Sequence, residues 1–171
     1  MNDVRGLSAP QWRELYQRLE RPLYNFAWRY VWNAQEAEDV VHDAFLNVWE
    51  RRANIRAETA NRYLWVAVLN LSRKKRRWAR AKQFLRIDTA PLDLPASDAV
   101  EADAATSDEF RRLHIEIGRL PEALRAVLLL AEFGGMSYEE ISQLLSIPPG
   151  TVASRRHLAV KRLRARTGSI R

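Results

Sequence analysis

The chain has 171 residues, of which 47% are apolar, and 28 basic against 21 acidic residues give it a net charge of +7. Six glycines and seven prolines are too few for an all-β fold, and the absence of cysteine excludes disulfides, thiolate metal sites and a cysteine nucleophile. Three histidines without an HExxH-like pair argue against a zinc enzyme. With no signal-peptide layout at the start and no apolar run of membrane-spanning length, we expect a cytoplasmic, all-α protein without metal, cofactor or membrane insertion.

The charge is concentrated in separate segments. Residues 51–86 carry twelve basic residues and one acidic residue, and residues 151–171 carry seven basic residues and no acidic one. Residues 87–110 carry seven acidic residues and no basic one, and their many Ala, Asp, Pro, Ser and Thr residues have little to bury. We therefore expect two small helical domains, residues 11–86 and 111–167, joined by a flexible acidic linker at 87–110. The two basic segments indicate an anionic partner.

The first expected helix has apolar residues at helical spacing from Leu15 to Val31, and Pro22 is expected to bend or break it. A second helix is expected from Ala34 to about Arg51, with one buried apolar stripe. We interpret its other face as a docking surface or a solvated helix face, because no nucleophile, glycine loop or third metal ligand accompanies it. This face, here called the acidic strip, consists of Glu38, Asp39, His42, Asp43 and Asn47.

A third helix is expected from about Thr59, a candidate N-cap, to roughly Phe84. One side of this helix carries a polar stripe at helical spacing. Arginine and lysine suit phosphates and asparagine suits a base edge, so the stripe is expected to lie along nucleic acid. The stripe is formed by Asn70, Arg73, Lys74 and Arg77.

Three aromatic residues accompany the polar stripe. Tyr63, Trp65 and Trp78 are candidates for stacking on unpaired bases, which is the usual way in which a protein holds a single strand. The alternative interpretation, in which Tyr63 and Trp65 belong to the core, stays open at this point.

The second domain shows a helix-turn-helix pattern. One helix is expected to begin at residues 120–122 and to end at the glycine pair 134–135. Ser137 and Glu140 fit a capping box that opens a short helix, and Thr151 is expected to cap the final helix after a Pro-Pro-Gly break. The final helix is basic and carries no acid, which is typical of an element placed in a DNA groove. Its candidate DNA contacts are Thr151, Ser154, Arg155, Arg156, His157, Lys161 and Arg162.

Three stretches carry a family resemblance: AEDVVHDAFLNVWE, YLWVAVLN and LPEALRAVLLLAEFGGMSYEEISQLLSIPPGTVASRRHLAVKRLR. They resemble the two conserved domains of the extracytoplasmic-function (ECF) branch of the bacterial sigma-70 family, and the resemblance covers nearly the whole chain. It implies a dissociable, non-catalytic initiation factor, which acts as a monomeric subunit of the holoenzyme and directs core RNA polymerase to a specific set of promoters. It also implies restraint by an anti-sigma factor.

The resemblance implies a role for each group of residues. The acidic strip would dock on the clamp helices of the polymerase β′ subunit. The chain would also contact the β flap, and the acidic linker would thread toward the RNA exit path. The final-helix residues named above would read the upstream promoter element as double-stranded DNA. The downstream element would be captured and held as single-stranded DNA by Arg52, Asn54, Arg56, Tyr63, Trp65, Asn70, Arg73, Lys74 and Arg77.

Three positions in the final helix depart from the family pattern. Ala153 and Leu158 stand where basic residues are usual, and Arg156 stands where a leucine commonly packs inward. The resemblance therefore does not say which promoter sequence the final helix reads.

Two other functions are alternatives. An autonomous helix-turn-helix regulator would bind duplex DNA as a dimer without polymerase, but it leaves the acidic strip without a task, and no coiled-coil dimer helix is evident. A nucleic-acid-processing enzyme using Asp39, His42 and Asp43 would require turnover that depends on a divalent metal.

Overall fold

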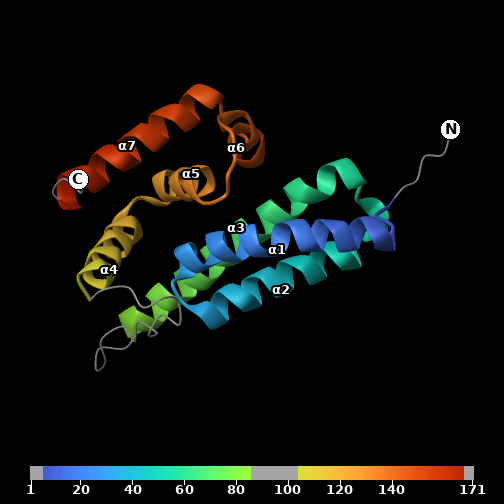
Figure 1. Ribbon diagram of the computed structural model, residues 1–171, viewed down its shortest axis with the longest axis horizontal. Coiled ribbons are helices and arrows are strands. Elements are labelled where there is room, and N and C mark those ends of the chain that lie inside the picture. Colours follow the sequence, from blue (N-terminus) through green and yellow to red (C-terminus); the bar gives the residue numbers. More distant parts are fainter. Residues whose placement is uncertain (1–5, 86–103, 168–171) are drawn as a thin grey trace. The chain divides into compact units, whose positions relative to one another are not determined.

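The computed structural model describes residues 6–85 and 104–167, and every regular element in these two ranges is helical, which confirms the expected all-α fold (Figure 1). The chain divides into two compact units, residues 1–94 (unit 1) and 95–171 (unit 2). Residues 87–103 of the expected linker lie outside the described residues. Its last part was wrongly assigned, because residues 104–110 form the first turns of a helix.

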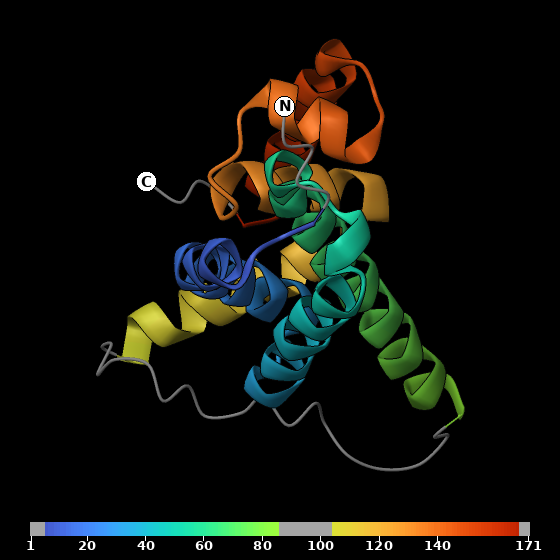
Figure 2. The same cartoon turned by 90° about the vertical axis from the view of Figure 1, so that its right-hand side faces the viewer.

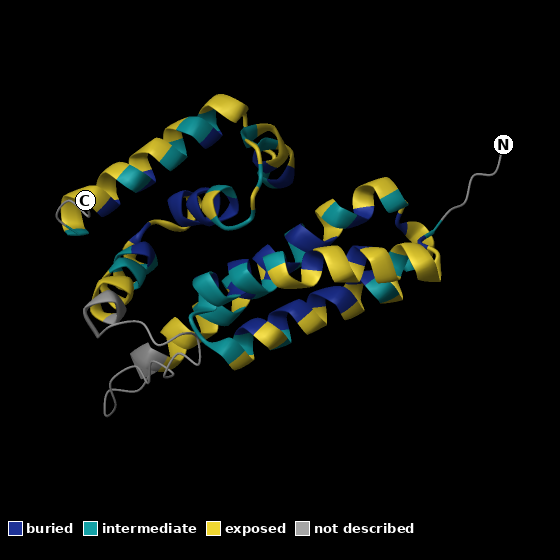
Figure 3. Ribbon diagram, viewed as in Figure 1, coloured by how far each residue is buried: buried dark blue, intermediate teal, exposed yellow. Residues whose placement is uncertain are grey.

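Unit 1 is a bundle of three helices, α1 (Ala9–Val31), α2 (Ala34–Glu50) and α3 (Ala57–Leu85), with a short 3-10 helix, η1 (Arg52–Asn54), between α2 and α3. The three α-helices pack against one another pairwise, and Figure 2 views them from a second direction. Their buried faces meet along a shared core, seen in Figure 3. Residues with no exposed surface in this core include Leu23, Phe26, Tyr30, Val40, Ala44, Leu64 and Val68.

Helix α1 continues through Pro22, so the expected break is wrong. Proline removes one backbone donor from the helix, but Leu19 and Leu23 on either side of it are both buried. Their packing holds this turn in place against the cost of the missing bond. At its start, the helix has a capping box that the sequence reading missed, in which Ser8 Oγ accepts the Gln11 N–H at 3.4 Å and Ser8 N–H donates to Gln11 Oε1 at 3.0 Å.

Helix α3 begins at Ala57, two residues before the expected cap. Thr59 lies inside the first turn, where its N–H and its Oγ1 hydroxyl both donate to the Arg56 carbonyl at 3.0 Å. Its hydroxyl therefore bonds a carbonyl of the preceding turn instead of accepting from N–H groups of the turn that follows, as an N-cap would.

Unit 2 contains α4 (Ala104–Arg119), α5 (Glu122–Glu132), α6 (Tyr138–Leu145) and α7 (Pro149–Thr167). Helix α7 packs against the other three. The capping box at α6 is confirmed, since Ser137 N–H donates to Glu140 Oε2 at 2.8 Å and Glu140 N–H donates to Ser137 Oγ at 3.2 Å. Helices α6 and α7 with the turn between them form the expected helix-turn-helix.

Helix α7 starts earlier than expected. Pro149 is its first residue, and the Pro148 carbonyl accepts from the N–H groups of Thr151 at 2.9 Å and Val152 at 3.1 Å. Thr151 therefore belongs to the first turn and is not the cap. Proline is well suited to this first position, because the N–H that it lacks would have had no partner there.

Candidate nucleic-acid interface

The acidic strip lies on the outer side of α2, away from the buried stripe. Four of its five residues are exposed, and Asp39 is half-exposed. Lys75 Nζ lies 3.2 Å from Asp39 Oδ2, which links the strip to α3. Both side chains are partly open to solvent, so this pair contributes little to stability, about 0–1 kcal/mol. No group of three potential metal-ligating side chains occurs among residues 6–85 and 104–167.

Leu46 is a surface residue of α2 that the sequence reading missed. Its side chain is 45% exposed, and it lies three residues after Asp43 and four after His42. The acidic strip therefore surrounds an apolar residue. Mixed apolar and polar surfaces of this kind are typical of protein–protein interfaces. The signal in the sequence was a leucine outside the three-four spacing of the buried stripe.

The basic run of α3 is divided between two tasks. Lys75 pairs with Asp39 of α2, and Arg76 Nη1 donates to the Tyr30 carbonyl near the end of α1 at 3.3 Å. These two cations therefore tie α3 to its neighbours. Lys74 and Arg77 are exposed instead, on the opposite side of the helix.

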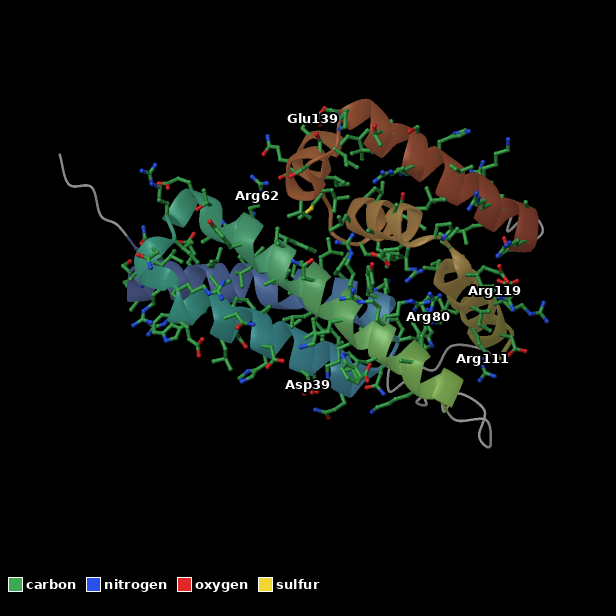
Figure 4. The ribbon with its side chains drawn as sticks, turned by 180° about the vertical axis from the view of Figure 1, so that it is seen from behind. Asp39, Arg62, Arg80, Arg111, Arg119 and Glu139 are labelled. Carbon is green, nitrogen blue, oxygen red and sulfur yellow. The ribbon has the colours of Figure 1, made fainter. Side chains whose placement is uncertain are left out.

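We call the exposed stripe Tyr63, Asn70, Lys74 and Arg77 the α3 polar face. Successive members are seven, four and three residues apart, which aligns them along one side of the helix. Tyr63 is 52% exposed, so its ring is open to stacking. Arg73 is half-buried at the edge of the face. In Figure 4, Arg62 and Arg80 lie along one edge of unit 1 and Asp39 lies on the other side.

Trp65 is a core residue, and its assignment to single-strand binding is wrong. Its side chain is 3% exposed, and its ring meets Phe26 edge-on with centroids 5.6 Å apart. A ring enclosed in this way cannot stack on a base without unfolding the bundle. The side chain of Trp78 is 62% exposed, so its ring, unlike that of Trp65, is open to stacking on a base.

The segment between α2 and α3 is held from both sides. The Arg52 guanidinium lies 3.9 Å from the centroid of the Trp49 ring and donates to the Trp49 carbonyl at 2.9 Å. Leu7 N–H donates to the Arg52 carbonyl at 3.1 Å, and the side chain of Ile55, at the end of the segment, is buried. Asn54 and Arg56 remain exposed.

Helix α7 presents most of its candidate DNA contacts to solvent. Ser154, His157, Lys161 and Arg162 are exposed, and Thr151 and Arg155 are half-buried. The helix has no acidic residue from 149 to 167. Its exposed side is therefore uniformly cationic or neutral, which suits a phosphate backbone.

Arg156 makes a different contact from the one expected. Its Nη2 lies 2.6 Å from Glu132 Oε1, and its Nη1 donates to the Tyr138 hydroxyl at 3.4 Å. The hydrogen bond to Glu132 raises the pKa of Arg156. Arg156 thus links α7 to α5 and α6, a contact between residues too distant in sequence to be inferred from spacing.

The described helices include none long and apolar enough to cross a membrane. Residues 15–82 match the Sigma-70 region 2 family, and residues 110–163 match the Sigma-70, region 4 family.

Characterised relatives agree with both family matches. The RNA polymerase sigma-H factor of Pseudomonas aeruginosa is 33% identical over 141 residues, which are 74% of this chain and 70% of that protein. The ECF RNA polymerase sigma factor RpoE of Cereibacter sphaeroides is 30% identical over 155 residues, covering 88% and 83%. The sigma factor RpoE of Bartonella quintana, solved in complex with the anti-sigma factor NepR, has the same fold, with a TM-score of 0.68 at 19% identity over 93% of this chain and 99% of that one. The chain therefore belongs to the ECF sigma factors of the sigma-70 family, the initiation factors that direct RNA polymerase to promoters.

Proposed function

We propose that this sigma factor is a monomeric, cytoplasmic, non-catalytic subunit of the holoenzyme, in which residues 11–86 bind core polymerase and open the downstream promoter element. Residues 111–167 read the upstream element as duplex DNA. The observation that carries the proposal is the presence on one chain of two surfaces whose composition suits two different forms of nucleic acid. The α3 polar face combines an exposed aromatic ring with cations, which suits a single strand, and α7 is an acid-free helix after a tight turn, which suits a groove.

Opening without catalysis has a physical basis in these surfaces. A base that leaves the duplex loses stacking, and an exposed ring such as Tyr63 replaces part of that loss. Phosphate contacts from Lys74 and Arg77 then favour the captured strand over the closed duplex. The free energy of binding the single strand therefore offsets the cost of opening the duplex, and no nucleotide hydrolysis is needed.

We also propose restraint by an anti-sigma factor. The support is by analogy, because a relative of the same fold was solved with the anti-sigma factor NepR. A protein that covers the α3 polar face and α7 at once would block both nucleic-acid surfaces.

Transcription with purified core RNA polymerase on a library of genomic fragments tests the proposed function. Discrete start sites that depend on the added chain are the expected result, and their upstream sequences give the promoter motif. Duplex DNA binding without any new start site would favour the autonomous helix-turn-helix regulator instead.

The double substitution Asp43→Ala and Leu46→Ala is expected to weaken binding to core polymerase about tenfold, because it removes a charge and an apolar contact from one surface. Both residues are exposed on α2, so the circular-dichroism spectrum is expected to stay unchanged. Titration of labelled core polymerase measures the affinity.

The matched control for this surface is Glu14→Ala with Gln17→Ala, at two exposed positions of α1. It removes the same charge elsewhere on the bundle and is expected to keep full affinity. Equal affinity of the α2 variant and the unmodified protein would remove the docking role from the acidic strip.

Arg155→Ala is expected to reduce the slope of log affinity against log salt concentration by about 1, as the loss of one phosphate contact does. Arg156→Ala is expected to leave that slope unchanged, since its guanidinium is held by Glu132 and Tyr138. Holoenzyme binding to a promoter fragment at several salt concentrations measures both. The reverse pattern, with the slope changed by Arg156→Ala alone, would contradict these roles.

A further inference from the structure

Leu158 is an exposed apolar residue in the middle of a basic helix. Its side chain is 39% exposed. By contrast, Val152 and Leu163, which are the aliphatic residues of α7 that face the core, are 0% and 9% exposed. Packing within unit 2 therefore does not account for a leucine at this position.

The position of Leu158 on α7 follows from helical spacing. It lies four residues after Ser154 and three before Lys161, both of which are exposed. It also lies three residues after Arg155 and four before Arg162, which flank it on one side. Leu158 therefore lies on the exposed part of α7, between the row of Ser154 and Lys161 and the row of Arg155 and Arg162.

The charge around Leu158 indicates what it contacts. Between 149 and 167 the helix has no acid, and its cations surround the leucine on the outward side. This arrangement fits an anionic partner that also offers a small apolar group. Duplex DNA is such a partner, because its major groove displays the 5-methyl group of thymine between two phosphate backbones.

We infer that Leu158 is a specificity-determining residue, which contacts the methyl group of a thymine in the upstream promoter element. The inference rests on the proposed role of α7 in reading that element. An arginine or lysine at this position would bond a guanine edge or a phosphate, whereas leucine has no donor and gains only from an apolar contact. The base pair that meets Leu158 is therefore A·T, with its thymine methyl facing the helix.

Replacing thymine by deoxyuridine tests this directly, because uracil keeps every hydrogen-bonding group and lacks only the methyl group. Each thymine of the upstream element of a promoter obtained in the transcription experiment is replaced singly, and holoenzyme binding is measured by competition. At one thymine, or at two adjacent ones, the affinity is expected to fall about three- to fivefold, as the loss of one buried methyl group does.

Leu158→Ala identifies the protein side of the contact. The variant is expected to lose a similar factor of affinity on the natural promoter and to become insensitive to uracil at that same thymine. Ile115→Ala, at a 41% exposed position of α4, is the matched control and is expected to keep the uracil effect. Rescue of uracil sensitivity by Leu158→Met would add support, because methionine restores an apolar side chain of similar length.

Two results would overturn the inference while leaving the role of α7 intact: a promoter on which no thymine responds to uracil, or a Leu158→Ala variant with undiminished sensitivity. In either case Arg155→Ala would still reduce the salt dependence of binding. Failure of the proposed function is recognised separately, because Arg155→Ala would then leave the salt dependence unchanged on every promoter.

Discussion

Replacing Arg125 by methionine is expected to lower the free energy of unfolding of unit 2 by about 3 kcal/mol. Arg125 is 2% exposed, and its guanidinium lies where α4 ends and α5 begins. Its Nη2 donates to the Leu120 carbonyl at 2.6 Å, and its Nε donates to the Ile117 carbonyl at 3.3 Å. The Ile117 carbonyl also accepts from the Leu120 N–H at 3.2 Å, so the substitution mainly takes the guanidinium donor away from the carbonyl of buried Leu120, beyond the end of α4.

The distribution of tryptophan makes this measurement specific. All six tryptophans lie between residues 12 and 78, within unit 1, so tryptophan fluorescence follows unit 1 while circular dichroism follows both units. Arg125→Met is expected to shift the circular-dichroism transition to lower denaturant and to leave the fluorescence midpoint unchanged. Arg119→Met, which removes a surface ion pair with Glu116, is the control and is expected to cost at most about 0.5 kcal/mol. An Arg125→Met variant as stable as this control would contradict the role given to the buried guanidinium.

Local sequence signals predicted much of the fold. The Ser137 capping box and the buried stripe of α2 depend on residues within a turn or two of each other, and both are present. The break expected at Pro22 was wrong because the effect of proline depends on packing: buried Leu19 and Leu23, on either side of it in α1, hold the turn that proline alone would disfavour. The start of α7 was misplaced for a local reason, since Pro149 suits a first helical position as well as it suits a break.

The candidate site was predictable to a similar extent. Helical spacing placed Asn70, Lys74 and Arg77 on one side of α3. The contacts of Lys75 with α2 and of Arg76 with α1 were not predicted, because they depend on how the helices pack. The same spacing would have put Trp65 in the core, since it lies four residues before Leu69 and three before Val68, both buried. The pairing of Arg156 with Glu132 could not be predicted from local spacing, because the two residues are 24 positions apart and meet only when unit 2 folds.

The double charge reversal Lys74→Glu and Arg77→Glu is expected to reduce promoter opening about 100-fold, as the loss of two charge-assisted phosphate contacts does. Both side chains are exposed on the α3 polar face, so each substitution puts a negative charge beside the captured strand without disturbing the core. Permanganate reactivity of unpaired thymines in the holoenzyme–promoter complex measures the opening. Binding to core polymerase is expected to stay unchanged, because the acidic strip is on α2.

The control for total charge is Arg13→Glu with Arg18→Glu, two exposed positions of α1 that give unit 1 the same change in net charge. If long-range attraction alone brought unit 1 to the promoter, both double variants would lose opening to the same extent and high salt would weaken the difference from the unmodified protein. If Lys74 and Arg77 contact the strand directly, only the α3 variant loses promoter opening. Wild-type permanganate reactivity in the α3 variant would show that the single strand is held elsewhere, and the assignment of this face would then be wrong.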